Sequence, residues 1–136
     1  MKIAARVINS AGLHRVTVGT DGSAKEISIA PNAVGKGSSI NGSELLMLAL
    51  ATCYCNDIYR EAAKQDIPVD AVEVICESEF GWPGEAGKNI QYKVHITSSV
   101  SCDILEDLIK HTDTVAEIHN TLRKGATVTL LSNNTM

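Results

Sequence analysis

The amino-acid sequence predicts an α+β fold in which helices pack against antiparallel sheet. Three observations support this prediction. The first thirty residues alternate between apolar and polar positions around short turns, a long apolar helix is indicated at residues 43–65, and residues 69–131 combine a strand pair, two helices and a last strand. Runs of strands beside runs of helices are typical of this fold class.

Length and composition are those of an ordinary globular protein. The 136 residues suffice for one domain with its own core, which we expect to span residues 1–136. The formal net charge of −4 disfavours a nucleic-acid partner. The longest apolar run, Leu45 to Ala51, is too short to cross a membrane, and no secretory signal follows Met1. We therefore expect a cytoplasmic protein without a membrane partner.

Residues 1–30 are predicted to form a three-stranded meander. Apolar residues at alternate positions, Ile3, Ala5 and Val7, indicate the first strand, and residues 13–18 and 26–29 indicate the other two. Asp21-Gly22 separates the second strand from the third, and glycine readily adopts the positive φ that a tight hairpin turn requires. Residues 31–42 are rich in Gly, Ser and Asn and are expected to form a loop.

The helix predicted at residues 43–65 is the most distinctive element. Asn41 or Ser43 is the expected N-cap, and Glu44 suits the first turn, where a carboxylate interacts favourably with the helix dipole. As far as Cys55 the helix is apolar on nearly every side, so we expect burial on most sides. Beyond Cys55 one face becomes polar, while the inward stripe continues through Ile58, Tyr59 and Ala62.

The remaining elements follow from periodicity. Alternation at residues 69–80 and 90–97, with a Gly- and Pro-containing segment between them, predicts a long hairpin. Helical spacing predicts helices at residues 103–111 and 114–123, the second with an apolar stripe at Val115, Ile118 and Leu122. Gly125 should end that helix, and residues 126–131 are predicted to form a final strand.

Cysteine usage indicates thiols. In a cytoplasmic protein the four residues Cys53, Cys55, Cys76 and Cys102 are expected to remain reduced. Free cysteine often packs as a small hydrophobic residue, and this is our interpretation of all of them except Cys53. No CxxC or HxxxH spacing supports a zinc set made from Cys53, Cys55, His14 and His119, so we predict no metal and no cofactor.

Two segments resemble the OsmC/Ohr family, which comprises osmotically inducible protein C and the organic hydroperoxide resistance proteins. "GSSINGSELLMLALATC", which ends at Cys53, resembles the family's central-helix signature, and "VAEIHNTLRKGATVTL" resembles its second signature. The resemblance implies an intertwined homodimer with two buried central helices and two active sites at the subunit interface. It also implies a peroxidatic cysteine on the central helix, a second cysteine that resolves its sulfenic acid, and an arginine, held by a glutamate, that activates the first thiol.

These roles carry over only in part. The resemblance places the peroxidatic cysteine at Cys53. The position of the family's glutamate falls on Ser43, and that of the second cysteine falls on Ala116, so both partners are substituted. Arg15 is the candidate activating cation, with Arg6 as the alternative. His119 follows Ala116 by three residues, a spacing that brings side chains to one helix face, so we consider it a candidate base or ion-pair partner for the thiol.

Two functions are compatible with this pattern. The first is a thiol-dependent peroxidase in which Cys53 reduces an organic hydroperoxide and an external thiol recycles it, without an intramolecular disulfide. Its partners would be a second copy of the chain, the hydroperoxide and the thiol reductant. The second is a non-catalytic dimer that binds a small apolar or thiol-bearing ligand in its interface pocket. The substitutions at Ser43 and Ala116 favour the second, and Cys53 favours the first.

Overall fold

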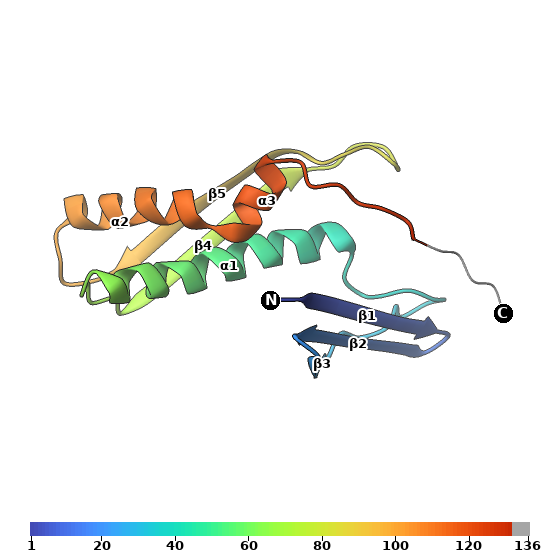
Figure 1. Ribbon diagram of the computed structural model, residues 1–136. Coiled ribbons are helices and arrows are strands. Elements are labelled where there is room, and N and C mark those ends of the chain that lie inside the picture. The colour runs from blue at the N-terminus through green and yellow to red at the C-terminus, as the bar shows by residue number, and fades with distance from the viewer. Residues whose placement is uncertain (132–136) are drawn as a thin grey trace. The chain divides into compact units, whose positions relative to one another are not determined.

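The computed structural model describes residues 1–131, and it has the mixed α+β architecture with antiparallel sheets that the sequence predicts (Figure 1). Its internal contacts divide the chain into two compact units, Met1–Leu45 and Leu46–Met136. Within residues 1–131, no helix combines the length and apolar character needed to cross a membrane. The elements are β1 (Ile3–Ser10), β2 (Leu13–Thr20), β3 (Ser23–Ile27), α1 (Gly42–Lys64), β4 (Ala71–Glu79), β5 (Lys88–Thr97), α2 (Cys102–Val115) and α3 (Glu117–Arg123).

The first unit contains the predicted meander. β1 pairs with β2, and β2 with β3, both antiparallel. The turn between β2 and β3 contains Asp21 at a φ of 49° and Gly22 at 83°, the two positive values that a type I′ hairpin needs. The side chain of Asp21 also accepts a hydrogen bond of 2.7 Å from the backbone N–H of Lys2. The hairpin prediction is therefore confirmed.

α1 begins with a capping box at Asn41 and Glu44. The Asn41 side-chain oxygen accepts a hydrogen bond of 2.9 Å from the backbone N–H of Glu44, and the Glu44 carboxylate accepts one of 2.8 Å from the backbone N–H of Asn41. Two N–H groups that the helix cannot satisfy are thereby paired. Of the two predicted caps, Asn41 is the one the structure uses, and the Glu44 carboxylate is engaged in the cap.

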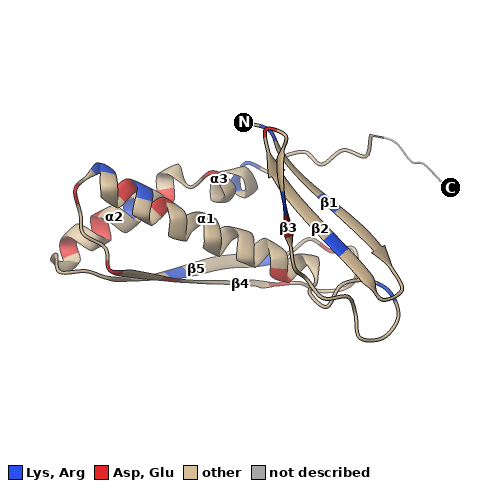
Figure 2. Cartoon of the chain, turned by 90° about the horizontal axis from the view of Figure 1, so that it is seen from below, with Lys and Arg blue, Asp and Glu red and all other residues tan. Residues whose placement is uncertain are grey.

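In the second unit, β4 and β5 form a long antiparallel hairpin, and the helices lie on one of its faces (Figure 1). Side chains on β4 alternate between partly buried and exposed, as a strand covered on one side requires. Figure 2 shows that charged residues recur along α2, whereas the central turns of α1 carry none. Those uncharged turns of α1 include the predicted reactive position at Cys53.

The core of this unit forms where α1 meets the hairpin and α2. Its fully buried side chains include Tyr54, Ile58 and Leu108, and partly buried residues of β4 and β5 pack around them. The Tyr54 hydroxyl donates a hydrogen bond of 2.7 Å to the Ile109 carbonyl, which ties α1 to α2. The first half of α1 is less covered in the single chain, where Leu45 and Leu48 remain exposed.

Three expectations differ from the structure. Residues 126–131 form no strand, and Val128, Leu130 and Leu131 are exposed, because a strand needs a neighbouring edge with which to pair. The predicted helix at residues 114–123 starts instead at Glu117, because Ala116 is extended and separates it from α2. Tyr59 was predicted to face inward and is exposed, because the buried face continues through Asp57 and Glu61 beside Ile58.

Candidate functional site

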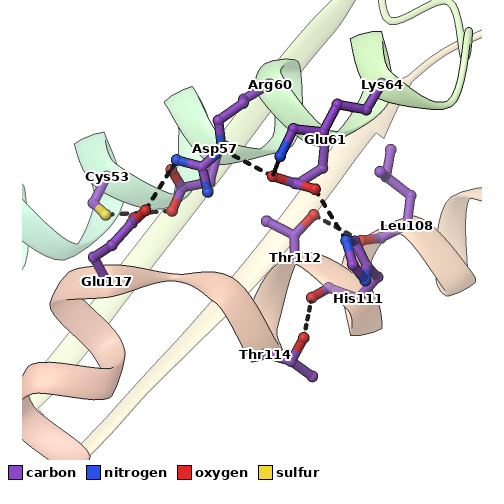
Figure 3. Close-up of polar contacts among 10 residues, drawn as sticks. All are labelled: Cys53, Asp57, Arg60, Glu61, Lys64, Leu108, His111, Thr112, Thr114 and Glu117. Carbon is purple, nitrogen blue, oxygen red and sulfur yellow. Dashed lines mark hydrogen bonds and ion pairs between the residues drawn. The ribbon is translucent and has the colours of Figure 1, made fainter.

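The candidate site lies on one face of α1 and opposite the start of α3. Cys53, Asp57 and Arg60 follow one another at spacings of four and three residues, which bring side chains to the same helix face. Glu117, the first residue of α3, approaches them from the other side. Figure 3 shows these four side chains directed toward one another.

The thiol of Cys53 has a carboxylate as its hydrogen-bond partner. Its Sγ donates to Asp57 Oδ2 at 3.4 Å, and Arg60 Nη1 lies 2.9 Å from the other oxygen, Asp57 Oδ1 (Figure 3). The same Arg60 nitrogen lies 3.1 Å from Glu117 Oε1. Cys53 Sγ and one carboxylate oxygen from each of Asp57 and Glu117 lie within 4.8 Å of one another. Because Arg60 is ion-paired with both carboxylates, we assign no metal site to them within residues 1–131.

This environment keeps the thiol protonated. Burial raises the pKa of Cys53, and the negative charges of Asp57 and Glu117 raise it further, while the backbone of Ile118 acts in the opposite direction. The pKa of Asp57 is also raised, mainly by burial and then by Glu117, against the opposing effects of Cys53 and Arg60. The site is thus a protonated thiol beside a basic carboxylate, whereas the family resemblance implied a thiolate beside an arginine.

A second carboxylate, Glu61, anchors the cation of the site. Glu61 Oε1 lies 2.8 Å from Arg60 Nε and 3.0 Å from Lys64 Nζ, and its other oxygen is 3.0 Å from His111 Nε2 (Figure 3). Hydrogen bonds from Arg60, Lys64 and His111 lower the pKa of Glu61 to about 2. This network fixes the Arg60 side chain, which in turn holds Asp57 and Glu117.

The arginine candidates from the sequence lie in the meander. Arg15 Nη2 forms an exposed ion pair of 2.7 Å with Glu26 Oε1 across β2 and β3. Arg6 lies on β1 opposite Thr17. Ser43 is in the first turn of α1, beside the capping carboxylate of Glu44. The roles proposed for Arg15 and Arg6 toward Cys53 therefore stay predictions.

Ala116 and His119 have distinct surroundings. Ala116 is fully buried and directly precedes Glu117, so the α2–α3 junction faces the cluster around Cys53. His119 is buried in an aromatic cluster, with its ring centroid 5.4 Å from that of Tyr54 and 4.7 Å from that of Tyr92. Neither ring nitrogen has a hydrogen-bond partner, and burial lowers the pKa of His119, so the imidazole is neutral at pH 7.

A cavity of about 220 Å³ opens beside this aromatic cluster. It borders α1 at Leu50, one helical turn before Cys53. The rest of its wall consists of Ile90, Gln91, Tyr92, His119, Leu122 and Arg123. The cavity is thus mostly apolar, with one guanidinium and one imidazole in its wall.

Sequence reasoning predicted Cys53 as the reactive residue and did not consider the charged residues Asp57, Arg60 and Glu117 beside it. The spacing of Cys53, Asp57 and Arg60 was a readable signal, because residues at i, i+4 and i+7 share a helix face. Glu117 could not be found this way, since its approach depends on how α3 packs. All four cysteines are free thiols, as the sequence predicted.

Comparisons with known proteins identify the family and support the fold. A family model described as OsmC-like protein matches residues 35–131. No curated protein sequence is significantly similar to this chain. Among solved structures, the chain is similar to an organic hydroperoxide resistance protein OsmC from Legionella pneumophila, with a TM-score of 0.60 and 20% identity, covering 90% of each chain.

Two further structures show the same fold. An OsmC-like protein from Mycoplasma pneumoniae has a TM-score of 0.61 and 18% identity, covering 91% of this chain and 87% of its own. An organic hydroperoxide resistance protein from Elizabethkingia anophelis has a TM-score of 0.62 and 16% identity, covering 92% of this chain and 90% of its own. At these identities the similarity establishes the fold and leaves the activity open.

Proposed function

Because this chain belongs to the family of OsmC-like proteins, we propose that it is a thiol-dependent peroxidase that reduces organic hydroperoxides through Cys53. The observation that carries the proposal is the position of Cys53, partly buried in the middle of α1 and hydrogen-bonded to a carboxylate. Two of the structures with the same fold are named as organic hydroperoxide resistance proteins.

The reaction proceeds in two balanced stages. In the first, Cys53 sulfur attacks the terminal peroxide oxygen, the O–O bond breaks, and thiol plus hydroperoxide become sulfenic acid plus alcohol. In the second, one external thiol forms a mixed disulfide with Cys53 and releases water. Another external thiol then attacks this disulfide, which restores the free Cys53 and releases the two external thiols as a disulfide. An external reductant is required because Ala116 occupies the position of the resolving cysteine, and Cys55 points to a different side of α1.

The apolar cavity next to Leu50 suits the organic part of a hydroperoxide. Its wall is formed largely by Leu50, Ile90, Tyr92 and Leu122, so burial of an alkyl or aryl group there stabilises the complex. Hydrogen peroxide gains nothing from such a surface. The enzyme should therefore prefer organic hydroperoxides to hydrogen peroxide.

The test replaces Cys53 by serine, with Cys55→Ser as the matched control two residues along the same helix. With cumene hydroperoxide and a dithiol donor, the wild type and Cys55→Ser should consume peroxide at similar rates, and Cys53→Ser should show only the uncatalysed rate. Mass spectrometry should find a single added oxygen on Cys53 after reaction without reductant. Equal peroxide consumption by the wild type and Cys53→Ser would rule the proposal out.

A second candidate function is ligand binding without turnover. The raised pKa of Cys53 and the alanine at position 116 favour it, because each removes part of a redox cycle. In that case the wild type would leave cumene hydroperoxide unchanged, yet an apolar ligand would protect Cys53 from labelling. Peptide-level labelling of Cys53 with a thiol reagent, with and without the ligand, separates the two functions.

We also propose that the active form is a homodimer. In the single chain, large apolar side chains remain exposed on α1, on the meander and in residues 126–131; they include Leu45, Leu48, Val7, Ile27, Val128 and Leu130. Apolar surface on this scale is typical of protein interfaces. A second copy of the chain would cover the exposed first half of α1.

Sedimentation equilibrium at micromolar concentration should give twice the chain mass. Leu48 is 59% exposed in the single chain. Leu48→Glu should shift the protein toward the monomer, because it replaces this apolar side chain by a charged one that the dimer would have to bury. Glu106→Gln, on the charged surface of α2, serves as the control and should remain dimeric. A wild-type protein that sediments as a monomer would contradict the dimer.

A further inference from the structure

The hydrogen bond between Cys53 and Asp57 gives the thiol a proton acceptor within the site. Asp57 is only 4% exposed, and each of its two oxygens has its own partner. Oδ2 accepts the proton of the Cys53 thiol at 3.4 Å, while Oδ1 is held by Arg60 at 2.9 Å (Figure 3). The carboxylate is thus oriented with one oxygen toward the sulfur.

We propose that Asp57 is a catalytic residue that accepts the proton of Cys53 and returns it to the leaving alkoxide, and that Arg60 is the positioning residue that orients it. This inference rests on the proposed peroxidase function. It assigns to Asp57 a role that none of the residues matched through the family resemblance fills.

A proton acceptor is needed because the thiol is protonated at rest. A thiol is a weak nucleophile until it loses its proton, and the buried, acidic surroundings of Cys53 disfavour a free thiolate. A base at hydrogen-bond distance can take the proton as the sulfur attacks. Asp57 is better suited to this than an exposed aspartate, because burial raises its pKa and makes its carboxylate more basic.

The same proton completes the reaction. When the O–O bond breaks, the terminal oxygen stays on sulfur and the remaining fragment leaves as an alkoxide, which must be protonated. Protonated Asp57 can donate at this point, so the thiol proton passes to the alcohol and Asp57 returns to its carboxylate form. No proton has to come from solvent, and no further co-reactant is needed for this stage.

The charged groups around Asp57 support this role. From α3, the negative charge of Glu117 raises the pKa of Asp57. On α1, Arg60 is shared between Asp57 and Glu117, and Glu61 holds its Nε. Arg60 thus fixes the direction of the carboxylate without neutralising the basicity that burial gives it.

The experiment compares two electrophiles on wild type and Asp57→Asn. Iodoacetamide reacts with the thiolate and releases iodide, which needs no proton, whereas cumene hydroperoxide releases an alkoxide, which does. Asp57→Asn removes both the base and a negative charge that raises the pKa of Cys53. Alkylation of Cys53 responds to both changes, so its rate is the reference for the state of the thiol. Single-turnover oxidation of Cys53 should become slower relative to its alkylation by about 10²-fold, the lower range for general acid–base catalysis.

A fall in the ratio of oxidation rate to alkylation rate distinguishes the proposal from simpler roles. If Asp57 acts only through its charge, both reactions accelerate together, and that result overturns the inference. Glu106→Gln is the control, because Glu106 is also a carboxylate paired with a cation, Lys110 Nζ at 3.5 Å, and both side chains are exposed on α2. It should leave the ratio of the two rates unchanged. Circular dichroism spectra and unfolding curves of each variant establish that it is folded.

Arg60 provides the second arm. Arg60→Gln should lower the oxidation rate relative to the alkylation rate, and Arg60→Lys should recover part of that ratio, since it restores a cation beside Asp57. If the wild type consumes cumene hydroperoxide no faster than Cys53→Ser, the proposed function itself fails and the inference with it. If the wild type is active and Asp57→Asn oxidises at the same rate, the inference alone is wrong.

Discussion

Replacing Tyr54 by alanine is expected to lower the free energy of unfolding by about 3–5 kcal/mol, the range for truncating a buried aromatic residue. Tyr54 has no exposed surface and packs against Tyr92, with ring centroids 4.8 Å apart, and against His119. It therefore contacts β5 and α3 from its place on α1, next to Cys53. The alanine would leave a cavity where three elements meet.

Tyr54→Phe is the matched control, because it keeps the ring and removes only the hydroxyl that donates to the Ile109 carbonyl. Loss of one hydrogen bond of this kind costs about 1 kcal/mol. Urea unfolding, followed by circular dichroism, measures both variants. If alanine and phenylalanine cost the same, ring packing contributes little and the hydroxyl is the dominant link between α1 and α2.

Local patterns in the sequence were sufficient to predict most of the elements. The hairpin at Asp21-Gly22 depends on backbone preferences of those two residues, and the Asn41–Glu44 cap depends on residues three positions apart. Alternation along β4 and helical spacing along α2 are equally local. Each of these signals lies within the segment it describes, so one sequence is enough to read it.

The errors occurred where packing between segments decides the outcome. The residues 126–131 have a strand-like pattern, yet a strand forms only against a partner edge, which a local pattern does not provide. The single extended residue Ala116 changes which face of α3 points inward. As a result His119 is buried, while Ile118 and Leu122, predicted as the inward stripe, are partly exposed.

The candidate site shows the same division. Cys53 could be placed from the helix signature, and Asp57 and Arg60 could have been found from their spacing on that helix. Glu117 could not, because it belongs to a segment distant in sequence. Its charge changes the expected chemistry, since two carboxylates beside Cys53 raise the pKa of the thiol. The activating arginine predicted in the meander, Arg15 or Arg6, stays a prediction, and within the second unit Arg60 on α1 binds the carboxylates.

Replacing Arg60 by alanine should therefore destabilise the protein in a pH-dependent manner. At neutral pH the variant leaves the buried Asp57 carboxylate without its cation, and removing the partner of a buried charge costs about 1–3 kcal/mol. We expect this range because Arg60 is partly exposed, and fully buried pairs cost about 3–5 kcal/mol to break. Arg15→Ala is the control: it breaks an ion pair of 2.7 Å between two exposed side chains and should change stability little.

The pH dependence follows from Glu61, whose pKa in the folded protein is about 2, compared with an ordinary value of 4.5. A carboxyl group with a lowered pKa stabilises the fold above the ordinary pKa, and this contribution is lost as the pH falls from 4.5 toward 2. Arg60 is the largest cause of the lowered pKa, so the variant has less of this stabilisation to lose. The difference in unfolding free energy between wild type and Arg60→Ala should be largest near pH 7 and shrink below pH 4.5. Urea unfolding across this range measures it, and a difference that does not change with pH would mean that Arg60 acts through the packing of its aliphatic stem.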